Sequence, residues 1–151
     1  MKSIIDIAGD YNVILTEIKD GDGYCQSNGI DTYINSSYCT GHIGNTDSRD
    51  LPEIYLGIYE DQELRLISFF HELGHVTSDI KFDEGITKYD IERDAWIKGL
   101  RIAQTHGIYF SFKAKRWAVG ELKTYEKYKH KKILNSEIFS IHLQRFNSEN
   151  D

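Results

Sequence analysis

The 151-residue sequence contains one proline and two cysteines, and it has no apolar run long enough for a membrane-spanning helix, which needs roughly 20 residues. The single proline, Pro52, argues against proline-rich linkers and favours one domain over residues 1–146, followed by a short flexible tail over 147–151. The N-terminus lacks the apolar segment of a secretory signal. Two cysteines, Cys25 and Cys39, cannot staple a chain of this length, so we expect a cytoplasmic protein without a membrane segment.

Basic residues are in the minority, with 18 Lys+Arg against 24 Asp+Glu and a formal net charge of -6. This balance makes a general nucleic-acid binder unlikely. The charges are unevenly distributed, because residues 113–132 hold eight basic and two acidic side chains, a net of +6 that leaves -12 for the rest. We predict a basic helix there, with Trp117, Tyr125 and Tyr128 packed in the core or against other helices rather than available to stack on bases. Its charges either offset the acidic body as a solvated face, which we favour, or bind an acidic partner.

Strand-like segments precede helical ones, so the sequence predicts an α+β fold in which a small, mostly antiparallel sheet comes first. The expected elements are a short helix over 2–9, strands over 11–18, 24–26, 32–35 and 53–59, and a long polar loop over 36–50.

Helical spacing of apolar residues begins after Asp61, which is suited to cap a largely buried helix. A second helix is predicted over residues 89–106. Thr87 and Asp90 have the spacing of a capping box at its start, and Gly107 is suited to end it.

The strongest pattern is His71-Glu72-Leu73-Gly74-His75, within the first of these helices. A spacing of four residues brings both imidazoles to one helical face, where they can bind the same ion. Glu72 can reach a water on that ion without ligating it, as in H-E-x-x-H zinc hydrolases. A random shuffle of this composition would contain the pattern roughly 0.02 times. Burial of these polar side chains without a shared partner would be costly, so we predict one Zn²⁺ per chain.

A catalytic zinc site needs a third protein ligand and one open position. The metzincin continuation is absent, since Ser78 and Lys81 stand where that motif has Gly and His. Glu92 is favoured, because it begins a face of the second helix that would allow close packing against the first helix. The small residues of that face are Ala95, Gly99 and Ala103.

Three aspartates are alternatives to Glu92 as the third ligand. Asp79 lies four residues after His75 and would share its face if the first helix continued that far. Asp90 has the position of a helix cap, and Asp94 points to another face of the second helix. Glu92 itself could also be an ordinary first-turn acid, favoured by the helix dipole.

The segments FFHELGHVTSD and ERDAWIKGLRIA resemble the minimal gluzincin-type metallopeptidases, especially ImmA/IrrE-type domains. The resemblance covers about residues 50–106, with a short linker between the motifs and Asp79 where a His or similar residue is common. It implies a zincin-like fold in which a short sheet precedes the HELGH helix and a later E-x-x-A helix provides the third zinc ligand. The matching residues are His71, Glu72, Leu73, Gly74, His75, Glu92 and Ala95.

These features favour a small peptidase that hydrolyses peptide or protein substrates. Zinc held by His71, His75 and Glu92 would activate a water, and Glu72 would be the general base. The strand over 53–59 could pair with an extended peptide. Candidate donors to the tetrahedral oxyanion are Tyr89, His106 and Tyr109, among which the sequence does not choose.

Two other functions compete with the peptidase hypothesis. One is a non-catalytic, zinc-stabilised interaction protein acting through residues 113–132, and the other is a nucleic-acid binder that uses the same segment. An intact Glu72 favours the enzyme, because a purely structural site needs no general base. A second metal site at Cys39-x-x-His42 is disfavoured, since it lacks further ligands. The composition, rich in Ile, Lys, Asn and Tyr, indicates an AT-rich genome such as that of a phage or mobile element.

Overall fold

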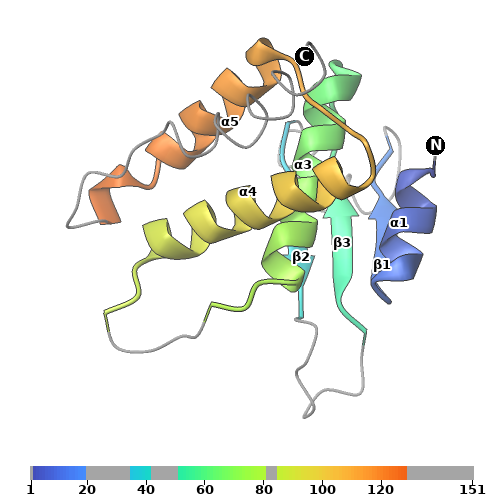
Figure 1. Cartoon of the computed structure of the whole chain (residues 1–151), viewed down its shortest axis with the longest axis horizontal. Coiled ribbons are helices and arrows are strands. Elements are labelled where there is room, and N and C mark those ends of the chain that lie inside the picture. The colour runs from blue at the N-terminus through green and yellow to red at the C-terminus, as the bar shows by residue number, and fades with distance from the viewer. Residues whose placement is uncertain (1, 20–34, 42–50, 81–84, 129–151) are drawn as a thin grey trace, which may run out of the picture.

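The computed structural model describes residues 2–19, 35–41, 51–80 and 85–128, which form an α+β fold (Figure 1). A small sheet packs against the central helix α3 (Gln62–Val76), and helix α4 (Lys88–Thr105) crosses α3 on the side away from the sheet. The predicted order of sheet first and helices later is therefore confirmed. None of the helices in the described segments is long and apolar enough to cross a membrane.

The sheet is mixed rather than mostly antiparallel. Strand β3 (Glu53–Leu56) lies in the centre, parallel to β1 (Ile14–Glu17) on one side and antiparallel to β2 (Tyr38–Thr40) on the other. Among the described strands one pairing is parallel and one is antiparallel, so this part of the sheet lacks the mostly antiparallel arrangement that the sequence predicted. The direction of each pairing depends on contacts between distant segments, which the local sequence pattern does not encode. Strand β2 lies within the segment predicted as a polar loop over 36–50.

Several predicted elements differ in extent or lie outside the described residues. The strands expected over 11–18 and 53–59 are shorter than predicted. Of the strand expected over 32–35, only Asn35 is described, and it lies in a turn with a positive φ of 53°. The strand expected over 24–26 lies outside the described residues. The short N-terminal helix is confirmed as α1 (Ile4–Asp10), which begins at a capping box of Ser3 and Asp6.

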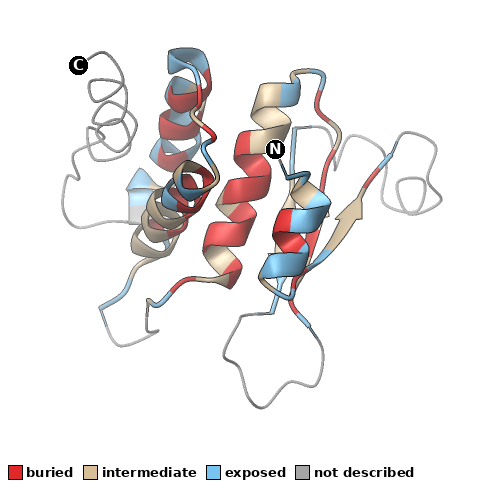
Figure 2. Ribbon diagram, turned by 45° about the vertical axis from the view of Figure 1, so that its right-hand side comes forward, coloured by how far each residue is buried: buried red, intermediate tan, exposed pale blue. Residues whose placement is uncertain are grey.

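Helix α3 begins where the sequence predicted. The Asp61 carboxylate accepts hydrogen bonds from the backbone N–H groups of Glu63 (2.9 Å) and Leu64 (3.3 Å), which caps the first turn. The middle of the helix is buried on nearly all sides (Figure 2). A helix so enclosed can hold polar side chains only where they share partners.

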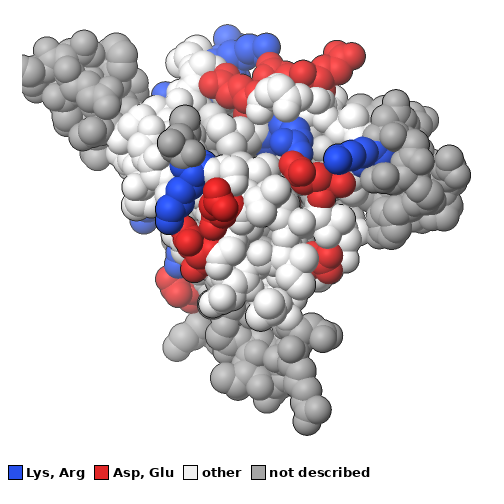
Figure 3. Space-filling view, turned by 90° about the vertical axis from the view of Figure 1, so that its right-hand side faces the viewer, with Lys and Arg blue, Asp and Glu red and all other residues white. Residues whose placement is uncertain are grey.

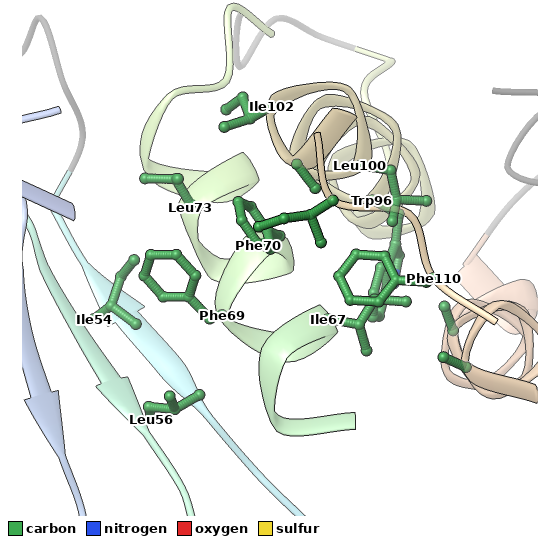
Figure 4. Packing of buried hydrophobic residues seen from close by; sticks show 14 of the residues in the cluster. Ile54, Leu56, Ile67, Phe69, Phe70, Leu73, Trp96, Leu100, Ile102 and Phe110 are labelled. Atoms are coloured by element: carbon green, nitrogen blue, oxygen red, sulfur yellow. The ribbon is translucent and has the colours of Figure 1, made fainter. Parts of the chain in front are cut away.

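The two sides of α3 pack against different layers. Phe69 lies toward Ile54 and Leu56 of the sheet, whereas Phe70 packs edge-on against Phe110, with ring centroids 6.1 Å apart (Figure 4). The core is therefore continuous from the sheet through α3 to the helices beyond.

Both ends of α4 follow the sequence signals. The Asp90 backbone N–H donates to Thr87 Oγ1 (3.1 Å) and the Thr87 N–H donates to Asp90 Oδ2 (3.0 Å), which confirms the capping box. At the other end Gly107 has a positive φ of 73°, and the N–H of Ile108 donates to the Ala103 carbonyl at 3.0 Å. This Schellman arrangement ends the helix at the predicted glycine.

Helices α3 and α4 approach each other through two glycines. A Cβ atom at Gly74 would lie 2.0 Å from the Ala95 carbonyl oxygen, and one at Gly99 would lie 2.1 Å from the Phe70 carbonyl oxygen. Side chains at these positions would force the helices apart. The predicted close packing through small residues of α4 is confirmed. On α3 the residue that allows this approach is Gly74 of the HELGH motif.

The basic segment forms a shorter helix than predicted. Helix α5 (Phe112–Lys123) ends well before residue 132, a short 3₁₀ turn follows at Glu126–Tyr128, and residues 129–132 lie outside the described part. Lys113, Arg116, Lys123 and Lys127 are exposed, and Lys113 pairs with Asp61 at 2.8 Å, which agrees with the expected solvated face that offsets acidic charge. Lys115 is the exception among the described basic residues of this segment, because it is buried. The predicted packing of Trp117 and Tyr125 against the core is confirmed.

The face that carries α1 and β1 shows acidic and basic side chains intermixed, with no broad area of one sign (Figure 3). Lys2, just before α1, pairs with Asp10 at the end of that helix, and Glu17 of β1 pairs with Arg65 of α3. The predicted tail over 147–151 lies outside the described residues.

The α3–α4 contact predicts that Gly99→Ala is strongly destabilising. The added methyl group would meet backbone atoms that cannot rotate away, which costs about 1–3 kcal/mol or more of the free energy of unfolding. Denaturant unfolding measures this cost. The matched control is Gly120→Ala in α5, where a Cβ atom meets nothing within 4 Å. That change should be neutral or stabilising by up to about 1 kcal/mol, and equal destabilisation by both changes would contradict the packing argument.

Candidate functional site

The centre of α3 faces α4 with two histidines one turn apart. The Nε2 atoms of His71 and His75 are 3.1 Å apart. Glu92, in the first turns of α4, completes the group: its Oε2 lies 3.0 Å from His71 Nε2, and its Oε1 lies 3.2 Å from His75 Nε2. One candidate ligand atom from each residue lies within 4.8 Å of the other two. The three predicted metal ligands are thus brought together.

The three side chains are mostly buried, with exposed fractions of 11% for His71, 18% for His75 and 16% for Glu92. The His71 ring is also stacked on the indole of Trp96, with ring centroids 3.9 Å apart and an interplanar angle of 26°. Trp96 lies one helical turn after Glu92, so α4 supplies both the carboxylate and the surface that orients the imidazole.

The group is strongly coupled electrostatically. Burial alone would raise the pKa of Glu92, but hydrogen bonds from His71 and His75 outweigh it and lower that pKa from 4.5 to about 2. Burial alone would lower the pKa of His75, but the hydrogen bond and charge of Glu92 outweigh it, and the pKa is raised. The carboxylate is therefore ionised and favours positive charge beside it.

The donor set is suited to a metal ion. Two imidazole nitrogens and a carboxylate oxygen that face one another repel through their lone pairs unless a proton or a cation lies among them. Two histidines and one carboxylate are ligands that Zn²⁺ accepts, and three protein ligands leave a fourth position for water or substrate. His71, His75 and Glu92 could therefore hold one such ion.

The three aspartates considered as ligands have other roles. Helix α3 ends at Val76, and the Asp79 side chain is 93% exposed and pairs with Lys98 Nζ at 2.7 Å. Asp90 caps α4, and Asp94 accepts a hydrogen bond from Ser78. None of the three joins the group formed by the histidines and Glu92.

A cavity of about 380 Å³ opens beside the three ligands. Glu72, the predicted general base, lines it and is only 7% exposed. Its walls come from the segment around β2, from α3 and α4, and from the far end of α5. The lining residues are Asn35, Ser36, Ser37, Tyr38, Cys39, Tyr59, Ser68, His71, Glu72, His75, Glu92, Trp96, Trp117, Glu121 and Tyr125.

Cys39 lies in the cavity wall near Glu72. Burial raises the pKa of its thiol, and the charge of Glu72, a hydrogen bond to that carboxylate and the charge of Glu92 raise it further. Cys39 is a free cysteine. Cys25 and His42, the partners considered for a disulfide or a second metal site, lie outside the described residues.

The three predicted oxyanion donors do not line the cavity. Tyr89 is fully buried in the first turn of α4, His106 follows the last turn of the same helix, and Tyr109 comes after it. Tyr59 does line the cavity, with its hydroxyl 3.0 Å from Ser37 Oγ, and burial raises its pKa. Tyr59 therefore keeps its proton and is the better-situated hydrogen-bond donor.

Sequence reasoning missed most of the cavity wall. Trp96 could have been found, because it lies four residues after Glu92 on the same helical face. Trp117, Glu121 and Tyr125 also recur every four residues, which is a signal of a shared face. Residues around β2 carried no comparable signal, since their position depends on strand pairing with β3.

Comparison with known proteins gave no match, whether with family models, with curated proteins or with solved structures.

The environment of Cys39 predicts an unreactive thiol. In a Cys25→Ser background, alkylation of Cys39 by iodoacetamide at pH 8 should be at least about tenfold slower in the folded protein than in denaturant, because the raised pKa leaves little thiolate. Mass spectrometry of timed samples measures the rate. Equal rates in the two states would show that the thiol is not held beside the carboxylates.

Proposed function

We propose that the protein is a zinc-dependent peptidase of the zincin type, in which His71, His75 and Glu92 hold one Zn²⁺. The observation that supports this most is the convergence of three candidate ligand atoms, from mostly buried side chains, beside a cavity that the carboxylate of Glu72 also lines. A site that only stabilised the fold would need neither the cavity nor this fourth polar side chain. The HELGH and E-x-x-A sequences resemble those of ImmA/IrrE-type metallopeptidases, which favours the same assignment.

Zinc bound there would supply a Lewis acid that polarises the substrate carbonyl and lowers the pKa of a bound water. Glu72 would accept the proton of the attacking water on its carboxylate and then donate it to the leaving amine. Its low exposure limits competing contact with solvent, and its neighbour Cys39 remains a neutral thiol that can orient the carboxylate.

The sheet edge offers a binding surface for an extended peptide. Strand β3, which the sequence favoured for this role, already has β1 and β2 as its neighbours. Strand β2 lies at the edge of the described sheet, and its residues Tyr38 and Cys39 line the cavity. A peptide paired with β2 would therefore pass close to the ligands. The Tyr59 hydroxyl would donate a hydrogen bond to the oxyanion that forms on the carbonyl oxygen.

The interaction hypothesis has less support. An acidic partner bound along residues 113–132 would need accessible cations. Arg116, Lys123 and Lys127 are exposed, but Lys113, although exposed, already pairs with Asp61, and Lys115 is buried. A partner protein or nucleic acid at this segment would have to rely on the remaining basic residues.

The metal assignment predicts close to one zinc per chain after purification without chelators. His71→Ala and Glu92→Ala should each reduce zinc content to background, because two remaining ligands cannot hold the ion tightly. Inductively coupled plasma mass spectrometry measures the ratio. Asp79→Ala is the matched control, since it removes a carboxylate that pairs with Lys98 on the surface, and its zinc content should equal that of wild type. A wild-type protein without zinc or another divalent metal would refute the assignment.

The catalytic assignment predicts that Glu72→Gln retains zinc and a normal unfolding transition but loses hydrolysis of a quenched fluorescent peptide library by at least about a hundredfold. The amide keeps the size and polarity of the side chain but cannot accept the proton. Peptidase activity equal to wild type in this variant would remove Glu72 from the reaction. If neither the wild type nor Glu72→Gln hydrolyses peptides and the two have the same biological activity, the interaction hypothesis is favoured.

A further inference from the structure

One wall of the cavity comes from the far end of α5 and the turn that follows it. Trp117, Glu121 and Tyr125 line the cavity and recur every four residues, so they share one face. Neither this wall nor the β2 segment, which also lines the cavity, belongs to the HELGH motif or to the E-x-x-A motif. It is therefore the part of the site in which substrate selection could be encoded independently of the metal ligands.

Glu121 has no cationic partner among the residues that the structure describes. Within the part of the chain that the structure describes, its side chain makes no hydrogen bond or ion pair, and no Lys or Arg is among the described residues that line the cavity. Glu121 is exposed, but the loss of water on the side that borders the cavity raises its pKa. The charge of His71 lowers this pKa, and the charge of Glu92 raises it. An acidic side chain that faces a cavity without a cation is free to bind one from outside.

The net charge of the cavity also favours a cationic ligand. Its ionisable side chains include three carboxylates, from Glu72, Glu92 and Glu121. A zinc dication on the ligands would leave a net charge of about -1 with neutral imidazoles. A cationic ligand would neutralise this charge, whereas an anionic one would meet Glu72 and Glu121.

The neighbours of Glu121 are aromatic. The Trp117 ring is held edge-on against Tyr59, with centroids 6.4 Å apart, and against Trp96, with centroids 6.2 Å apart. Aromatic faces beside a carboxylate form the usual surroundings of bound ammonium and guanidinium groups. The wall thus combines a negative charge with rings that can also attract a cation.

We propose that Glu121, flanked by Trp117 and Tyr125, is a specificity-determining residue that binds a cationic group of the peptide substrate, either a primary ammonium or a guanidinium. This inference rests on the proposed function, because it takes the ligand of the cavity to be a peptide. The group belongs to a lysine or arginine side chain or to the free N-terminus of the peptide, and the two sources can be separated experimentally.

The chain provides its own probe of this site. Its two tryptophans, Trp96 and Trp117, both line the cavity, so intrinsic fluorescence reports on ligands that enter it. Binding is measured on the zinc-supplemented Glu72→Gln protein, which should not hydrolyse the ligand during titration. The probes are Ac-Gly-Lys-Gly-amide, its Nε-acetyl-lysine counterpart, and Gly-Gln-Gly-amide with and without N-terminal acetylation.

We expect one cationic probe to bind about tenfold more tightly than its acetylated counterpart, as for a charge-assisted hydrogen bond. A preference in the lysine pair assigns the subsite to a basic side chain, and a preference in the N-terminal pair assigns it to the end of the substrate chain. Adding Glu121→Gln should reduce either ratio to about one. The matched control is Glu126→Gln, which removes the same charge five residues later, outside the cavity lining, and should keep the ratio.

Equal binding of charged and acetylated probes in both pairs would overturn the proposal, as would a preference that Glu121→Gln leaves unchanged. Failure of the peptidase assignment is distinguishable, because binding needs no hydrolysis. If the protein shows no peptidase activity but still prefers the lysine probe in a way that depends on Glu121, the proposed cation subsite stands and only the peptidase assignment is refuted.

Discussion

The close approach of α3 and α4 is the constraint on which the candidate site depends. Gly74 and Gly99 allow backbone to meet backbone at this crossing. This brings the start of α4 near enough for Glu92 to reach both histidines of α3. A wider separation would leave the two imidazoles on a buried face with no carboxylate. Helix packing thus explains the glycine of the HELGH motif, whereas the proposed metal binding explains the two histidines and Glu92.

The second consequence of this crossing is a cavity with chemically different walls. The α3–α4 side contributes the three candidate ligands and Glu72, the β2 side contributes a strand edge with Cys39, and the α5 side contributes aromatic rings and Glu121. Ser111 at the start of α5 is tied to Glu63 in the first turn of α3 by a hydrogen bond of 2.9 Å. This link fixes the direction in which α5 leaves the core and so helps to position the wall that carries Glu121.

Local signals in the sequence predicted the helices and their ends well. Asp61, Thr87 and Gly107 act through hydrogen bonds or backbone angles within a few residues, and such features depend little on the rest of the fold. Helical spacing likewise predicted the histidine pair and favoured Glu92. The sheet was predicted less well, because the pairing of β1 with β3 and the existence of β2 depend on contacts between distant segments. The cavity lining was predicted less well for the same reason. Tyr59 lines the cavity, whereas Tyr89, His106 and Tyr109 do not, and no spacing rule relates Tyr59 to the histidines.

X-ray absorption at the zinc edge tests the central claim most directly, since it reports the ligands of the ion in the intact protein. The account predicts a four-coordinate ion with two imidazole nitrogens at about 2.0–2.1 Å, oxygen for the remaining ligands and no sulfur. Loss of one oxygen ligand in Glu92→Ala, if that variant retains any zinc, would agree with this arrangement. A sulfur ligand from a cysteine, or six oxygen ligands without imidazole, would contradict it.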